Sequence, residues 1–83
     1  METRIGVVAV LLEERQQNVP RVNELLSEFS EIVIGRLGVP YRERGVNVIA
    51  LVVEGTTDQV GALTGKLGML GEGVRTKSLL LTK

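Results

Sequence analysis

The side chains best placed for chemistry begin with Glu13, Glu14 and Arg15, a charged stretch that directly follows an apolar run. Asn18 lies just beyond them as the predicted N-cap of a helix. A turn between a strand and a helix brings such side chains beside the free amides of the helix N-terminus, where small anions bind. Glu13, Arg15 and Asn18 are therefore candidate ligand-binding residues, although a solvated loop explains the same pattern.

Arg36, Arg42 and Arg44 form the densest basic cluster, with Tyr41 and Glu43 among them. A guanidinium binds a phosphate or a carboxylate through paired hydrogen bonds, so Arg36 joins the candidate ligand-binding residues. Charges of this kind also protect an edge strand from pairing with other chains. The sequence leaves both interpretations open.

The chain contains no cysteine and no histidine. Because these are the usual ligands of zinc, copper, haem and iron–sulfur clusters, we expect no metal site and no cofactor. General acid–base or nucleophilic catalysis would rest on an isolated Glu, Lys or Tyr. We therefore expect a protein that is not an enzyme.

The ten basic and ten acidic residues of the chain cancel. A protein without a broad positive field has little to hold the phosphates of nucleic acid, so we expect no direct nucleic-acid binding. No apolar stretch reaches the roughly 18 residues that a bilayer requires, and the first residues do not form a signal peptide. We expect a cytoplasmic protein with no membrane partner.

The apolar pattern divides the chain into six elements. Residues 5–12 and 46–53 are β-branched-rich runs that are too short for confident helices, which favours buried strands. Two other stretches carry a single apolar stripe at helical spacing. The predicted order is strand 5–12, helix from 18 to 29, a weaker strand 32–37 with a bulge or edge at Gly35, strand 46–53, a helix capped within 56–58 that runs to about 70, and strand 74–81.

This order predicts a single α+β domain over residues 1–83 with the ferredoxin-like βαββαβ arrangement. Right-handed crossovers place both helices on one face of a four-stranded antiparallel sheet. Between 5–12 and 46–53 only Asn47 is polar, and its amide is expected to be satisfied at a strand end. The uncovered face would be a large apolar patch, for which a second copy of the chain is the simplest partner. Candidate interface residues are Val8, Val10, Leu12, Ile49, Leu51, Leu79 and Leu81.

Three glycines, Gly61, Gly65 and Gly68, lie on one side of the second predicted helix. Each costs about 1 kcal/mol of helix propensity relative to alanine. Close packing against a neighbouring helix or subunit would offset that cost. A helix anchored by its leucine stripe also tolerates such glycines, and both explanations stay open.

The stretch from Gly61 to Gly68, together with 22–26, Phe29-Ser30 and 36–40, resembles the family of iron-only hydrogenase system regulators over nearly the whole chain. The resemblance implies a stand-alone ACT-like domain, related in fold to the C-terminal domain of the nickel-responsive repressor, and a role as a transcriptional regulator. Two features of these relatives are missing. The charged stretch after the first strand lacks the glycine-containing turn of amino-acid-binding ACT domains, and the histidine and cysteine ligands for nickel are absent.

The sequence thus predicts a non-enzymatic regulatory domain that acts as a homo-oligomer, either a dimer or a tetramer. Such a domain would sense a small ligand or dock on a regulatory or hydrogenase-maturation protein. The alternative is a ligand-free structural or adaptor protein for hydrogenase assembly.

Overall fold

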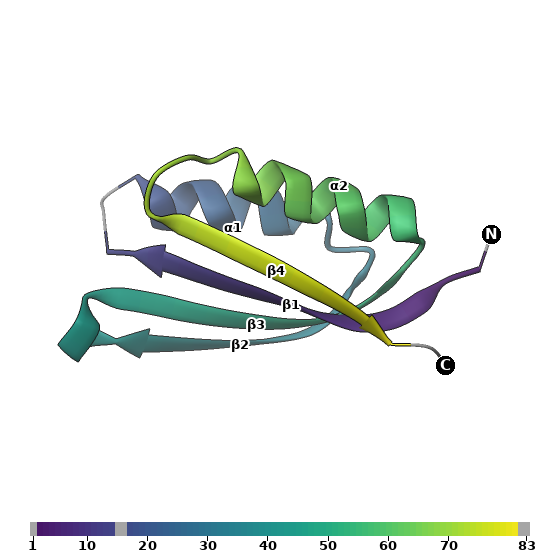
Figure 1. The fold of residues 1–83 in the computed structure, drawn as a ribbon, viewed down its shortest axis with the longest axis horizontal. Helices are drawn as coiled ribbons and strands as arrows, with labels where there is room; N and C mark the ends of the chain where they lie inside the picture. Colours follow the sequence, from purple (N-terminus) through teal and green to yellow (C-terminus); the bar gives the residue numbers. More distant parts are fainter. Residues whose placement is uncertain (1, 15–16, 82–83) are drawn as a thin grey trace.

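The computed structural model describes residues 2–14 and 17–81, which form a slab of about 40 × 20 × 17 Å. Its strands form one antiparallel sheet in the order β2-β3-β1-β4, and both helices lie on the same face of it (Figure 1). The predicted ferredoxin-like βαββαβ fold is confirmed. The elements are β1 (Arg4–Glu13), α1 (Asn18–Glu28), β2 (Val33–Tyr41), the 3-10 turn η1 (Arg42–Arg44), β3 (Val46–Gly55), α2 (Thr57–Gly68) and β4 (Val74–Leu81).

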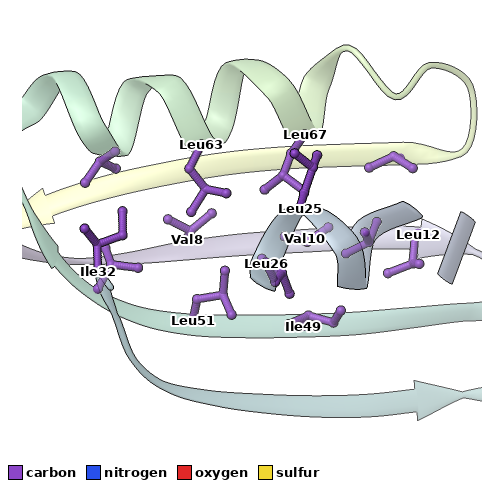
Figure 2. Packing of buried hydrophobic residues seen from close by; sticks show 14 residues of the cluster. Val8, Val10, Leu12, Leu25, Leu26, Ile32, Ile49, Leu51, Leu63 and Leu67 are labelled. Carbon is purple, nitrogen blue, oxygen red and sulfur yellow. The ribbon is translucent and has the colours of Figure 1, made fainter. Parts of the chain in front are cut away.

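The hydrophobic core lies between the two helices and the sheet (Figure 2). Alternate side chains of β1 and β3 point into it, because successive residues of a strand face opposite sides. The helices contribute residues at intervals of three and four, which is the spacing of one helix face. Core side chains are Val8, Val10 and Leu12 of β1, Ile49, Leu51 and Val53 of β3, Val22, Leu25 and Leu26 of α1, and Val60, Leu63 and Leu67 of α2.

Five of the predicted interface residues belong to this core, which corrects their assignment. Val8, Val10, Leu12, Ile49 and Leu51 are at most 7% exposed beneath the helices and cannot meet another subunit of the folded chain. The prediction chose the wrong face because both faces of β1 and β3 are apolar. Leu79 and Leu81 do lie on the opposite, open face, where their role in an interface stays a prediction.

The two helices begin differently. Thr56 caps α2 in a complete capping box with Gln59, with an N···O distance of 3.1 Å from the Gln59 amide to the Thr56 hydroxyl. The N-cap of α1 is Gln17 and not Asn18, which is the first helical residue. Asn18 stands four residues before Val22 and therefore on the buried face of α1, where it donates a hydrogen bond to the Glu13 carbonyl oxygen at 3.2 Å.

Strand β2 runs farther than predicted and ends at Tyr41 instead of residue 37. It is an edge strand, so one side of its backbone needs no partner and Pro40 fits within it. The predicted irregularity at Gly35 is confirmed by a shift in register between Val33 and Gly35. The longer strand adds an edge to the sheet that α1 does not cover.

Within the described residues, no helix is long and apolar enough to cross a membrane.

Candidate functional site

The face of the sheet away from the helices is mostly apolar, and all four strands contribute apolar side chains to it. The register aligns Val7 of β1 with Val52 of β3 and Leu79 of β4. Paired residues of antiparallel strands point to the same face, so these three side chains lie in one row. Leu37, Ala50 and Ala9 form the next row. The open face comprises Ile5, Val7, Ala9 and Leu11 of β1, Leu37 and Val39 of β2, Val48, Ala50 and Val52 of β3, and Leu79 and Leu81 of β4.

The open face is as large as the largest apolar patch of a typical monomer. Strand spacings of about 4.8 Å and rises of about 3.4 Å per residue give these residues a flat area of about 360 Å², and the accessible surface of protruding side chains is larger. The largest apolar patch on a typical monomer is about 300–600 Å² and often functional. Val7 and Val52, near its centre, are 38% and 44% exposed. The open face therefore has the character of a contact surface.

Equal numbers of acidic and basic residues border the open face. By strand alternation Glu13 and Glu54 share the face of Leu11 and Val52, at the ends of β1 and β3. Arg75 and Lys77 lie on the same face along β4. The Thr3 hydroxyl donates a hydrogen bond to the Glu54 carboxylate at 2.8 Å. The border thus carries two acids and two bases, and it favours no single sign of charge in a partner.

A groove separates α1 from the edge strand β2. It has a volume of about 260 Å³. The Arg36 guanidinium of β2 donates a hydrogen bond to Asn23 Oδ1 of α1 at 3.2 Å, which joins the two walls. The groove arises because α1 packs over the core strands and leaves the helix-facing side of β2 uncovered. Other side chains around it are Leu12, Val19, Val22, Pro40, Asn47 and Ile49.

The groove has few polar groups, and none of the residues lining it is acidic. Arg36 has no carboxylate partner among the described residues. Asn47 was expected to have a satisfied amide, yet its side chain makes no hydrogen bond within the part of the chain that the structure describes. It lies half-buried in the groove instead. The groove therefore combines an apolar lining with one positive charge and one unpaired amide.

Of the three candidate ligand-binding residues that the structure describes, only Arg36 lines this groove. Glu13 lines a separate hollow with Gly73 and Arg75, and its amide donates to the Gly73 carbonyl oxygen at 2.7 Å. Asn18 is 3% exposed and already bonded to Glu13. Arg15 lies outside the described residues. Glu13 and Asn18 thus lie together at the turn after β1, and a ligand site there stays a prediction.

Asn23 and Asn47 were not singled out as site residues from the sequence. Asn47 offered a signal, since it interrupts an otherwise apolar strand. Asn23 offered none, because a polar residue on the exposed side of an amphipathic helix is ordinary. Only the three-dimensional pairing of α1 with β2 brings it to Arg36.

The three glycines of α2 do not pack closely against the rest of the chain. A Cβ added at Gly61, Gly65 or Gly68 would meet no described atom within 4 Å. The prediction of close packing is therefore wrong within one chain. Packing against another subunit stays a prediction.

The fold is that of ACT-like domains. The structure is similar to the ACT domain of GTP pyrophosphokinase from Chlorobium tepidum, with a TM-score of 0.70 and 17% identity over 100% of this chain and 91% of that one. It is also similar to the apo form of CPII, a nitrogen regulatory PII-like protein from Thiomonas intermedia K12, with a TM-score of 0.52 and 14% identity over 95% and 96% of the two chains. These likenesses show the fold.

The chain belongs to the TM1266-like family, described as iron-only hydrogenase system regulators, whose model matches residues 4–78. The structure of TM1266 from Thermotoga maritima is similar to it with a TM-score of 0.93 and 41% identity, covering 98% of this chain and 100% of that one. No curated protein shows significant similarity. The family named by the sequence resemblance is thereby confirmed.

Proposed function

We propose that this protein is a non-enzymatic regulatory module of an iron-only hydrogenase system that works as a homo-oligomer joined through the open face. The family description supports the regulatory role, and the ACT-like fold is consistent with it. The open apolar face is the observation that carries the assembly. Burying it against a second copy removes apolar surface from water, which is the main favourable term in protein association.

A second copy fits the open face better than a strongly charged partner. Two acids and two bases border the patch, so a second copy can offer charges of both signs. Two sheets pack face to face about 10 Å apart with interlocking apolar side chains. Stable interfaces bury at least about 600 Å² per partner, and the patch with its charged border approaches that size.

Regulation would follow from a shift in assembly or in affinity for a hydrogenase-maturation protein. A ligand can shift such an equilibrium only by binding one state more tightly than the other. The groove beside β2 favours this ligand-responsive role over a ligand-free adaptor, because β2 also contributes Leu37 and Val39 to the open face.

Analytical ultracentrifugation of matched variants tests the assembly. The wild-type chain is expected to be a dimer or larger at about 100 µM, where an interface of standard size is occupied. Val52→Glu places an unpaired carboxylate in the centre of the open face, and burying it costs several kcal/mol. The variant should therefore sediment as a folded monomer.

Met69→Glu is the matched control, because Met69 is 83% exposed at the end of α2, away from the open face. It should retain the wild-type assembly. A monomeric wild type, or equal effects of Val52→Glu and Met69→Glu, would contradict an interface at the open face. Far-ultraviolet circular dichroism of all three chains shows whether each is folded.

A further inference from the structure

We propose that the groove between α1 and β2 binds a small apolar carboxylate that carries no amino group. This inference rests on the proposed regulatory function, to which it adds the class of ligand. Three features of the groove lead to it: a positive group at one wall, an apolar lining, and the absence of acidic residues from that lining.

The carboxylate would bind at Arg36. Its guanidinium has five N–H donors in a fixed planar arrangement, which matches the two oxygens of a carboxylate. The hydrogen bond to Asn23 Oδ1 at 3.2 Å uses one donor and orients the group across the groove. No acidic side chain of the described residues pairs with it. Arg36 is thus a positioned cation with donors left for an anion.

The remainder of the ligand would lie on the apolar lining. Val19 of α1 and Pro40 of β2 are exposed apolar residues of this lining, and Ile49 of β3 lines it while only 7% exposed. The volume of about 260 Å³ falls just below the range of pockets for drug-sized ligands, about 300–1,000 Å³. A short branched or linear hydrocarbon chain fits these dimensions.

An α-amino acid of the same size fits less well. Its ammonium has three N–H donors that lose water on binding, and a buried donor without a partner weakens binding strongly. Asn47 could accept one of these hydrogen bonds through its amide oxygen. The side-chain oxygen of Asn23 already accepts a hydrogen bond from Arg36, and the other side chains that line the groove are apolar. The groove should therefore bind a carboxylate without an amino group more tightly than the corresponding amino acid.

A ligand bound in the groove would affect the open face through β2, which contributes residues to both. Gly38, Val39 and Pro40 line the groove, and the pairing of Leu37 and Val39 with β3 places both of them on the open face. A ligand between α1 and β2 therefore contacts the same strand that contributes to the proposed interface. A change in the position of β2 would alter both the groove and the proposed interface.

Three probes with one carbon skeleton test the ligand class. In an NMR titration of the ¹⁵N-labelled full chain, 4-methylpentanoate should shift amides of α1 and β2, with a dissociation constant of about 1 mM or below for so small a ligand. 4-Methylpentanamide lacks the charge, and leucine adds the ammonium. Each should bind at least about tenfold more weakly. Absence of binding by 4-methylpentanoate, or equal or tighter binding of either analogue, would overturn the proposal.

Matched variants test the location. Arg36→Met should weaken 4-methylpentanoate binding by about tenfold or more. Arg21→Met is the control, because Arg21 lies on another side of α1 in a different hollow, and it should bind as the wild type does. Gly38→Val should abolish binding by filling the groove while the chain stays folded, since an added Cβ meets nothing within 4 Å. Retained binding in Arg36→Met or in Gly38→Val would place the ligand elsewhere and refute the assignment.

Sedimentation of the same samples separates the two proposals. A chain that binds 4-methylpentanoate in the groove but remains monomeric retains this inference and loses the proposed assembly. A dimer that binds none of the probes retains the assembly and loses the ligand class.

Discussion

Gly6 of β1 lies close to the backbone of β4. A Cβ added there would lie 2.5 Å from the Leu79 carbonyl oxygen and 3.0 Å from the Leu80 Cα, both backbone atoms. Because backbone cannot move aside cheaply, Gly6→Ala should lower the free energy of unfolding by about 1–3 kcal/mol. Urea denaturation followed by circular dichroism measures the loss. Gly38→Ala, whose Cβ meets nothing within 4 Å, should show none, and an equal loss in both variants would contradict this account.

Asn18, which the sequence predicts as a ligand-binding candidate, has a structural role in the fold. Its buried amide donates to the Glu13 carbonyl oxygen and ties the start of α1 to the end of β1. Asn18→Ala leaves that carbonyl without this donor and should lower the free energy of unfolding by about 1–3 kcal/mol. Asn47→Ala is the comparison, because its side chain has no hydrogen-bond partner among the described residues. If both variants unfold at the same urea concentration as the wild type, the structural role of Asn18 is wrong.

The face that each residue of β1 and β3 occupies was the hardest property to predict. Both faces are apolar, so alternation could not distinguish Val8 from Val7. The charged residues that end the two runs contained the missing signal. Glu13 and Glu54 point to solvent, and by period two they place Leu11 and Val52 on the open face.

At the scale of elements, α2 contains two glycines that make the helix less stable than alanine would at the same positions. Gly61 and Gly65 are exposed within the helix, and a Cβ at either meets nothing within 4 Å. Replacing both with alanine should raise the free energy of unfolding by about 2 kcal/mol, since each glycine costs about 1 kcal/mol. Urea denaturation measures the gain. A gain without any change in oligomer size would show that these glycines do not pack against another subunit, whereas a smaller oligomer would show that they do.

The ends of the elements were predictable where local signals were strong. Strand β4 agrees with its predicted range of 74–81, because glycines precede it and Arg75 and Lys77 set the alternation. Gly71 and Gly73, predicted to stop the second helix, have positive φ values of 99° and 87° in the turn before β4, whereas α2 itself ends earlier, at Gly68. Strand β2 was cut short at 37 because Gly38 and Pro40 are typical of turns, and only its place at the sheet edge permits them.

At the scale of the whole molecule, the topology could be predicted and the groove could not. The order of elements and the right-handed crossover determine which strands are neighbours. The groove depends on how far α1 stands from β2, which no local pattern encodes. Arg36 was a candidate because of its charge, but its partner Asn23 emerged only from the packed structure.

Stability should depend on protein concentration if folding and assembly are linked. For a dimer that unfolds to separate chains, tenfold more protein favours the dimer by 1.4 kcal/mol, or about 0.7 kcal/mol for each chain. For a domain of this size that shift corresponds to a rise in Tm of about 3–6 °C for each tenfold increase in concentration. Differential scanning calorimetry over two decades of concentration measures it. Val52→Glu should remove the dependence and Met69→Glu should keep it, because only the first lies on the open face. A wild-type Tm that is independent of concentration over the two decades would mean that the open face contributes no assembly that stabilises the fold.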